Sequence, residues 1–203
     1  MEQKEIIISK INRSRRGTIF LPDNFLPIDS QYASNILGQL VNDGKLIRIS
    51  QGIYLKPVMT RFGPVMPTLY EIANKIAQRD HAKILPCGPV AENYLGFSTQ
   101  VPMNAVYITT GAARKIKIGN RTLTFKLRTP ENFAYKGEMM PILVLALKSI
   151  GRDNVTDDTL LTVYRVLKEH PEEKTWQEDI KLAPNWIRKI IMKTKKRIYA
   201  EMD

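Results

Sequence analysis

Cysteine and histidine are scarce in this chain of 203 residues, which contains one Cys and two His. A single cysteine, Cys87, excludes an internal disulfide framework and is typical of a protein from a reducing cytoplasm. Cys87 has no basic partner nearby in the sequence, so we interpret it as a small buried residue rather than a nucleophile. His81 and His170 have no second His or Cys at ligand spacing, which argues against a zinc site. The sequence also lacks a phosphate-cradling glycine-rich loop and a Gly-x-Ser-x-Gly motif. It therefore predicts no catalytic residue, metal or cofactor.

Long hydrophobic runs are missing too. The most apolar run, Met139 to Leu147, is far too short to cross a bilayer and contains Pro141. The N-terminus begins Met-Glu-Gln-Lys-Glu, with acids where a signal peptide has a basic leader and an apolar stretch. These features predict a cytoplasmic protein without a membrane partner.

The charge is strongly positive, with a net value of +11 and a pI near 9.7. Residues 1–58 carry 8 Lys/Arg against 5 Asp/Glu, residues 59–130 carry 10 against 3, and residues 131–203 carry 13 against 12. A surplus of Lys can merely aid solubility, but a basic protein of this kind suits a polyanionic partner. The middle segment should form the main electrostatic patch.

Residues 30–57 are the most informative part of the chain. Ser30 is a good N-cap for a helix whose apolar stripe has i, i+3, i+4, i+7 and i+8 spacing. That stripe consists of Ala33, Ile36, Leu37, Leu40 and Val41. Asp43-Gly44 ends the helix, because Gly44 can adopt the left-handed conformation. Residues 46–49 and 53–55 then read as two strands joined at Gln51-Gly52. A short helix followed by a basic hairpin is typical of a winged helix-turn-helix.

The opposite face of this helix is polar and almost uncharged. It carries Gln31, Ser34, Asn35, Gly38 and Asn42. Such a face can be an ordinary solvated surface, but solvated faces usually carry Glu and Lys. Gln, Ser and Asn are side chains that hydrogen-bond base edges in the major groove. Gly38 costs about 1 kcal/mol relative to Ala within a helix, and a close approach of DNA is one feature that would justify it. The segment is therefore predicted to bind DNA.

The residues before this segment complete the plan of the fold. Residues 3–12 suggest a helix, although the Ile triplet within them could also start a strand. The basic loop 13–17 suits phosphate contacts or an ordinary solvated turn. A short strand at 17–21 and a brief helix at 22–25 follow. Together they predict a winged helix-turn-helix domain over residues 1–58.

A second domain is predicted over residues 59–203, with a basic α/β part at 67–130 and a helical part at 131–203. Residues 58–67 read as a linker, because they contain Gly63, Pro64 and Pro67. The basic part should contain helices at 68–78 and 90–95, strands at 83–85 and 105–109, and a hairpin of 114–118 with 122–127. The fold class is therefore predicted to be α+β.

The helical part has three predicted helices. Met140–Ile150 is apolar on nearly every side and should be a central buried helix. Residues 156–168 should follow, with Thr156 as the N-cap and Leu160, Leu161, Val163, Tyr164 and Leu167 facing inward. A last helix begins at Pro184.

Carboxylates cluster in the last third of the chain and leave an enzymatic alternative open. Asp179-Ile180-Lys181 matches the Asp-x-Lys part of metal-dependent nucleases, which use an acid and a lysine around one magnesium ion. The alternatives to DNA binding are thus a metal-dependent nucleic-acid-processing enzyme and a protein-interaction module without DNA binding.

Several blocks of the sequence together resemble the AbiEi-type antitoxins, the winged-helix transcriptional regulators of type IV toxin–antitoxin systems. The matching blocks are residues 33–40, 44–48, 52–57, 63–67, 88–96, 98–102 and 107–109. The likeness covers about residues 15–150, and Leu-Gly-Phe-Ser-Thr-Gln-Val-Pro at 95–102 is its most specific part. Wings of this family often carry an Arg at the tip, where Gln51 stands here.

This resemblance implies an antitoxin that binds repeats in its own promoter and represses its operon. It implies double-stranded DNA with inverted repeats as one partner. The second partner is functional, a nucleotidyltransferase toxin that the C-terminal domain opposes without a stable complex. It also implies that residues 59–203 form an AbiEi-like antitoxin domain.

Two sets of candidate site residues follow. Those predicted to bind DNA are Arg13, Arg15, Arg16, Gln31, Tyr32, Ser34, Asn35, Arg48, Gln51 and Lys56. Gln31, Tyr32, Ser34 and Asn35 would read bases, while the arginines and Lys56 would hold phosphates. Those predicted to form a second basic or antitoxin surface are Ser98, Thr99, Gln100, Arg114, Lys115, Lys117, Arg121, Lys126 and Arg128. Residues 98–100 could equally form a structured turn that caps neighbouring elements.

Overall fold

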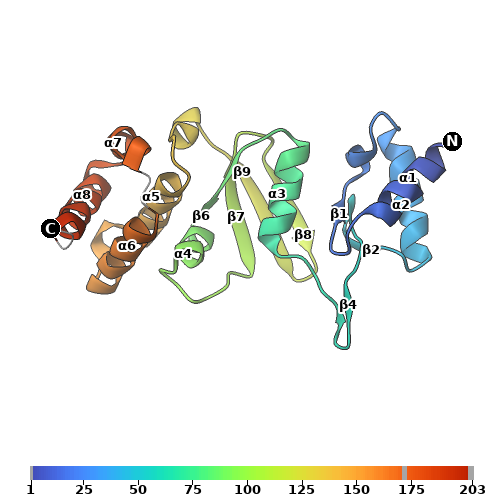
Figure 1. Ribbon diagram of the computed structural model, residues 1–203, viewed down its shortest axis with the longest axis horizontal. Coiled ribbons are helices and arrows are strands. Elements are labelled where there is room, and N and C mark those ends of the chain that lie inside the picture. The colour runs from blue at the N-terminus through green and yellow to red at the C-terminus, as the bar shows by residue number, and fades with distance from the viewer. Residues whose placement is uncertain (1, 171–172, 201–203) are drawn as a thin grey trace. The chain divides into compact units, whose positions relative to one another are not determined.

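The computed structural model describes residues 2–170 and 173–200 and shows an α+β protein (Figure 1). Its chain divides into two compact units. The first contains the residues up to Ala82 together with 116–122, and the second contains 83–115 and the residues from Leu123 onward. The predicted domain boundary at residue 58 lies inside the first unit.

The first unit begins with α1 (Gln3–Arg13), β1 (Ile19–Phe20) and the 3-10 helix η1 (Pro22–Phe25). The helical alternative for residues 3–12 is thereby confirmed. Next come α2 (Ser30–Asn42), β2 (Ile47–Ser50) and β3 (Ile53–Leu55), as the sequence predicts. The strands form an antiparallel sheet of order β1-β3-β2. Because β3 is the central strand, all three of its residues are buried.

One hydrophobic core holds α1, η1, α2 and this sheet together. It contains Ile7, Ile11, Phe20, Phe25, Ile28, Ala33, Ile36, Leu37, Leu40, Leu46 and Tyr54. Four of the five predicted stripe residues of α2 belong to it, and Val41 packs against it half-buried. Gly44 has a φ of +71°, the left-handed conformation predicted for the end of this helix. The buried side of α2 is therefore fixed, and its opposite side is left to the solvent.

The segment predicted as a linker is instead a small hairpin. Its strands β4 (Met59–Thr60) and β5 (Gly63–Pro64) pair antiparallel. The linker prediction was wrong because Gly63 closes a tight turn with a φ of +105° rather than interrupting structure. Helix α3 (Leu69–Arg79) follows, and a capping box between Thr68 and Glu71 begins it.

The second unit contains most of a four-stranded sheet of order β6-β7-β9-β8. Strand β6 (Ile84–Cys87) pairs antiparallel with β7 (Asn104–Thr109), and the short helix α4 (Pro89–Leu95) lies between them in the sequence. Strands β8 (Arg114–Ile118) and β9 (Arg121–Leu127) form the predicted hairpin. The 3-10 helix η2 (Pro130–Phe133) leads away from the sheet.

The helices α5 to α8 gather beside this sheet in the second unit (Figure 1). They are α5 (Met139–Ile150), α6 (Asp157–Glu169), α7 (Glu173–Leu182) and α8 (Asn185–Ala200), with the 3-10 helix η3 (Arg152–Asn154) between the first two. Helix α5 is the central buried helix that its apolar sequence predicts. Thr156 caps α6 as predicted, but Leu161 is 58% exposed, so its predicted inward position was wrong. Thr159, Val163, Val166 and Leu167 form the buried side.

Among the residues that the structure describes, no helix combines the length and the apolar character needed to cross a membrane.

Candidate nucleic-acid interface

The exposed side of α2 is neutral and polar. Gln31, Tyr32 and Asn35 are all exposed on it, and the sequence of α2 contains no charged residue. Gln31 Nε2 donates to Asn35 Oδ1 at 3.3 Å, so two side-chain amides one turn apart lie together. The side chains that could contact a base edge are thus held next to each other on the protein surface.

The N-terminus of α2 is capped by Asp29 rather than by Ser30. The Asp29 carboxylate accepts a hydrogen bond from the Tyr32 amide at 2.8 Å, whereas the Ser30 hydroxyl donates to Asp23. The prediction that Ser30 is the N-cap was wrong, because Asp and Ser are about equally good N-caps and Asp29 directly precedes Ser30 in the sequence. Since a carboxylate already occupies this helix end, a phosphate contact must come from basic side chains elsewhere.

Ser34 belongs partly to the interior. Its half-buried hydroxyl lies 3.2 Å from the hydroxyl of Tyr54, a side chain of β3 that is only 2% exposed. A buried phenol needs a hydrogen-bond partner, and Ser34 supplies it. Ser34 therefore joins α2 to the sheet, and base reading by Ser34 stays a prediction.

The loop after α1 carries three exposed arginines, Arg13, Arg15 and Arg16. None of them forms an ion pair with a residue that the structure describes. The loop is ordered, because the Thr18 hydroxyl donates to Arg15 O at 2.7 Å and the Ser14 hydroxyl to Ile11 O at 2.6 Å. Three guanidinium groups are thus held at the surface without an ion-pair partner among the described residues.

The side chain of Lys56 holds this arginine loop in place. Its ammonium donates to the carbonyl oxygens of Ile11, Asn12 and Ser14 at 2.8, 3.0 and 2.9 Å. A lysine has three donors, so all of them are used at the C-terminus of α1. Lys56 therefore positions the loop that carries the arginines, and a phosphate contact by Lys56 stays a prediction.

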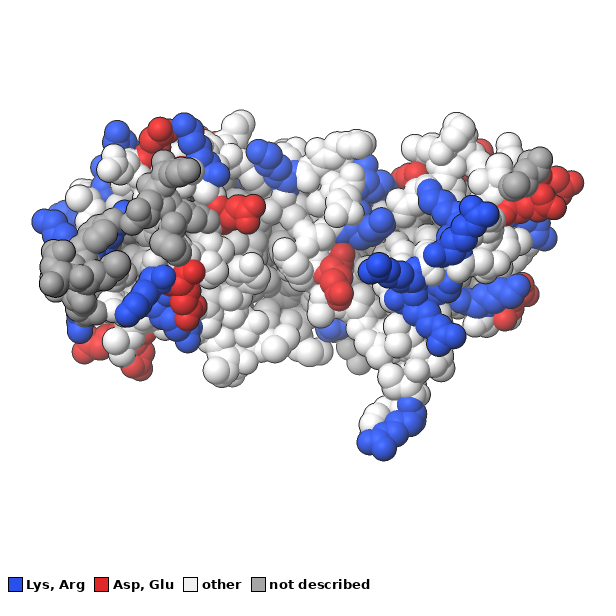
Figure 2. Space-filling view, viewed as in Figure 1, with Lys and Arg blue, Asp and Glu red and all other residues white. Residues whose placement is uncertain are grey.

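Arg48 in β2 and Gln51 in the turn between β2 and β3 are both exposed. The chain contains no acidic residue from Gly44 to Tyr70, while it contains Lys45, Arg48, Lys56 and Arg61. Figure 2 shows Lys and Arg side chains gathered on one face of the first unit and again at the tip of its projecting hairpin. This face suits a polyanion.

The tip of the β8–β9 hairpin adds to the same unit. The Ser50 hydroxyl at the end of β2 donates to the Lys117 carbonyl oxygen at 2.9 Å, and both residues belong to the first unit. Strand alternation exposes Lys115 and Lys117 and turns Ile116 and Ile118 inward. One part of the predicted second basic surface therefore adjoins β2.

The other residues of that predicted surface have mixed environments. Lys126 and Arg128 are exposed, whereas Arg114 and Arg121 are half-buried. The Arg114 guanidinium lies over the Phe125 ring, 5.8 Å from its centroid. Residues 98–100 lie outside helices and strands and are held by hydrogen bonds, since the Ser98 hydroxyl accepts from the Gln100 amide at 3.2 Å and the Ser98 carbonyl oxygen accepts from Asn93 Nδ2 at 3.1 Å. Thr99 and Gln100 remain exposed.

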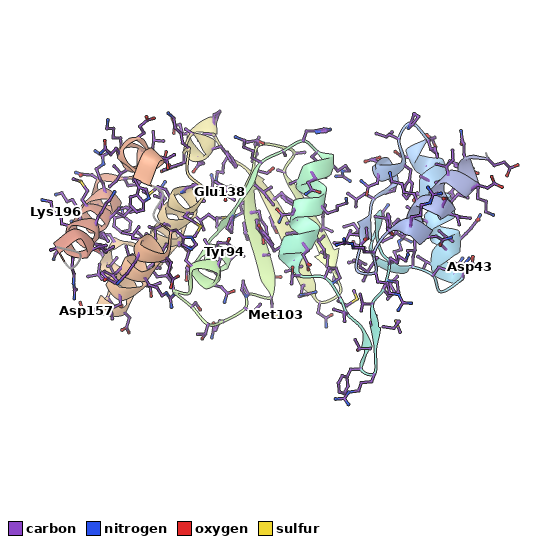
Figure 3. All side chains as sticks on the ribbon, viewed as in Figure 1. Asp43, Tyr94, Met103, Glu138, Asp157 and Lys196 are labelled. Carbon is purple, nitrogen blue, oxygen red and sulfur yellow. The ribbon has the colours of Figure 1, made fainter. Side chains whose placement is uncertain are left out.

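The second unit contains a cavity of about 360 Å³, and Tyr94, Gly96, Arg165, Glu169 and His170 are among its lining residues. Arg165 donates to Leu95 O at 3.2 Å and lies so close that a Cβ atom at Gly96 would come within 2.4 Å of the guanidinium. Exposed Tyr94 and Met103 flank the 95–102 string (Figure 3). The φ of +77° at position 96 favours glycine, and any larger residue would also displace the Arg165 guanidinium.

Asp179, the acid of the Asp-x-Lys match, is 1% exposed in α7. Its two oxygens accept hydrogen bonds from the amides of Lys136 and Gly137, each at 2.8 Å. Both oxygens therefore fasten the loop before α5. This carboxylate has a structural use and does not face solvent.

Cys87 is the single cysteine of the chain and is half-buried. Burial raises the pKa of the Cys87 thiol above its ordinary value, while Lys126 and Arg128 lower it by a smaller amount. A raised pKa keeps the thiol protonated near neutral pH. Among the described residues, no group of three or more His, Cys, Asp or Glu side chains could hold a metal ion.

These features define a basic α+β protein whose first unit exposes a neutral polar helix face and a loop with three arginines that form no ion pair with any described residue. Residues 6–175 match the model of DUF6088, a family of unknown function, and the chain belongs to this family. Comparison with curated proteins gave no match.

The arm-like β4–β5 hairpin and its Arg61 were missed by sequence reasoning. The signal was present in Thr60-Arg61-Phe62-Gly63, because a glycine after two central residues can close a short hairpin. It was hidden by the prolines on either side, which are more typical of a linker.

Proposed function

We propose that this protein is a sequence-specific DNA-binding antitoxin and autorepressor of a type IV toxin–antitoxin operon that opposes a nucleotidyltransferase toxin. Its first unit acts as a winged helix-turn-helix, in which α2 is the recognition helix and β2–β3 is the wing. The antitoxin role rests on the resemblance to AbiEi-type proteins. The DNA-binding role rests on the residues of the first unit.

The exposed face of α2 is the observation that carries the proposal. Gln31 and Asn35 present amides without competing charge, and side-chain amides can bond bidentately to adenine in the major groove. Arg13, Arg15, Arg16 and Arg48 supply phosphate contacts around this face. Ser34 and Lys56 are left out, since each is used inside the protein.

A binding assay with the DNA upstream of its own gene tests base reading. Asn35→Ala should reduce the preference for this DNA over random DNA by about 1–3 kcal/mol, because one bidentate contact is lost. The measurement is fluorescence anisotropy with both duplexes. Equal losses on both would contradict base reading by Asn35, and no binding by the wild type would refute the DNA-binding role.

Arg48→Ala separates phosphate contacts from base contacts. It should weaken binding to both duplexes alike and lower the slope of log affinity against log salt by about one. Arg152→Ala, which changes an exposed arginine in η3, is the matched control and should leave the slope unchanged. A slope unaffected by Arg48→Ala would remove Arg48 from the interface.

Gly38 tests the close approach of the duplex to α2. A Cβ atom at this position would meet no heavy atom within 4 Å beyond the backbone of its own helix. Gly38→Ala should therefore stabilise the fold by about 1 kcal/mol while weakening DNA binding, because the helix gains propensity and loses clearance. A variant that gains stability and binds DNA as tightly as the wild type would show that the duplex stays away from residue 38.

The antitoxin role needs a cellular test. Expression of the chain should restore growth of cells that express the nucleotidyltransferase encoded beside it. The same rescue by a variant with Arg48→Ala would place neutralisation outside the DNA-binding face. No rescue, or the absence of a nucleotidyltransferase gene in the operon, would refute the antitoxin role without touching DNA binding.

A further inference from the structure

The β4–β5 hairpin, residues 59–64, which we call the arm, exposes apolar side chains to an unusual degree. Phe62 at its tip is 86% exposed, the highest value among the large apolar side chains that the structure describes. Met59 and Val65 are 61% and 51% exposed. Adjacent exposed apolar side chains usually mark a contact surface. We therefore expect the arm to contact a partner.

Local hydrogen bonds hold the arm in one conformation. The Thr60 hydroxyl donates to Gly63 O at 2.8 Å and accepts from the Phe62 amide at 3.2 Å. At its base the Val65 amide donates to Val58 O at 2.9 Å. Figure 1 shows the arm projecting from the first unit. A preorganised projection loses less entropy when it binds than a disordered loop does.

The tip combines a cation with an aromatic ring. The Arg61 guanidinium carbon lies 4.6 Å from the centroid of the Phe62 ring. Proteins that enter the minor groove of DNA use arginine for its negative potential and apolar side chains as wedges against base steps. The acid-free stretch from Gly44 to Tyr70 includes the whole arm, so no carboxylate of the arm opposes a phosphate.

The arm is also continuous with the proposed DNA-binding face. Lys56 leads into it, and the Lys56 carbonyl oxygen accepts from the Gly17 amide at 2.7 Å. Val58 lies 3.7 Å from the position of a Cβ atom at Gly17. The base of the arm therefore contacts the loop that carries Arg13, Arg15 and Arg16.

We propose that the arm contacts the minor groove of the same duplex that α2 reads, beside the base-reading site, with Arg61 in the groove and Phe62 against a base step. This proposal rests on the proposed DNA-binding function. A duplex suits the arm better than a second copy of the chain does. A stable interface between proteins buries about 800 Å² on each partner, which exceeds what the tip of one short hairpin can cover.

Variants of the tip test the proposal. The probe is a duplex from the region upstream of the chain's own gene, with the bound segment located by footprinting. Arg61→Ala and Phe62→Ala should each weaken binding at least about fivefold, the order of a stacking contact to a base. Arg61→Ala should also reduce the salt slope. The matched controls, Lys196→Ala for an exposed cation and Leu161→Ala for an exposed apolar side chain, should bind as the wild type does.

Base analogues in the flank identify the groove. Inosine·cytosine pairs present an A·T-like minor groove and a G·C-like major groove, whereas G·C pairs add an amino group to the minor groove. The wild type should tolerate replacement of flanking A·T pairs by inosine·cytosine and should lose affinity when G·C replaces them. The two tip variants should be indifferent to both replacements.

Each of the other possible results overturns the arm proposal, and one of them also overturns the proposed function. If the wild type binds the duplex and the tip variants bind equally well, the arm proposal is overturned while the proposed function stands. If the wild type binds no DNA, both fall. If Phe62→Ala sediments as a smaller species than the wild type, the arm joins copies of the chain and the proposal is overturned.

Discussion

The two β-hairpins of the first unit follow one another in the sequence but are held by different forces. In β2–β3, the strand β3 lies between two neighbours, and Ile53, Tyr54 and Leu55 are at most 4% exposed. In β4–β5, each strand has one partner, and Met59 is 61% exposed. Burial of apolar side chains stabilises the first hairpin, whereas the second has little of it and depends on local hydrogen bonds.

This contrast separates residues that keep the fold from residues that are available to a partner. Polar side chains also divide into those that are used inside the fold and those that are exposed to a partner. Lys56 and the Ser34 hydroxyl have polar chemistry suited to DNA, but their contacts lie within the protein. Arg13, Arg15 and Arg16 are exposed and form no ion pair with a described residue, so their charges are available at the surface. Residue type alone therefore overstates the number of contact residues.

Among substitutions within the two hairpins, the largest effect should come from the central strand. Leu55→Ala removes a side chain that is 1% exposed, and it should lower the free energy of unfolding by about 2–5 kcal/mol. Met59→Ala, four residues later, should change it by less than about 0.5 kcal/mol. Urea denaturation of both variants measures the difference. Similar losses in the two variants would contradict the distinction between the hairpins.

A smaller loss of folding stability is expected when Lys56, which supports the arginine loop, is replaced. Lys56→Met keeps most of the aliphatic stem but deletes three hydrogen bonds from an ammonium, and it should destabilise the first unit by about 1–3 kcal/mol. Lys45→Met, at an exposed position, is the matched control and should cost less than about 0.5 kcal/mol. Thermal unfolding measures both. A Lys56→Met variant as stable as the control would return Lys56 to the set of available cations.

The hydrogen bond between Ser34 in α2 and Tyr54 in β3 should contribute less to the free energy of unfolding than the hydrogen bonds of Lys56 do. Ser34→Ala deprives the buried Tyr54 hydroxyl of its partner and should cost about 1 kcal/mol. Tyr54→Phe removes the other hydroxyl, so the loss from Ser34→Ala should largely disappear in the Tyr54→Phe background. Denaturation of the four members of this cycle measures the coupling. Additive losses would show that the hydroxyls do not interact.

The helices and strands were predictable where one periodicity was strong. The stripes of α2 and α3 and the alternation in β8 follow directly from the spacing of apolar residues. In α6 the same reasoning placed Leu161 inside, although Thr159 and Val166 occupy the buried side. A sequence rich in apolar residues fits more than one stripe, and only the packing against other helices decides between them.

The candidate site was predictable as a segment but not residue by residue. Exposure of Gln31, Tyr32 and Asn35 follows from helical spacing. The uses of Ser34 and Lys56 depend on Tyr54 and on the carbonyl oxygens of residues 11–14, which are distant in the sequence. Long-range hydrogen bonds of this kind leave no local pattern.

The smallest effect on stability should belong to the most exposed side chain of the arm. Phe62→Ala should change the free energy of unfolding by less than about 0.5 kcal/mol, because the ring is 86% exposed and covers little of the fold. Phe25→Ala, which removes the same side chain from a position that is 3% exposed, should cost about 3–5 kcal/mol. Urea denaturation of the two variants gives the comparison. If Phe62→Ala approached the loss of Phe25→Ala, the ring would be part of the core, and the arm would not be available to a partner.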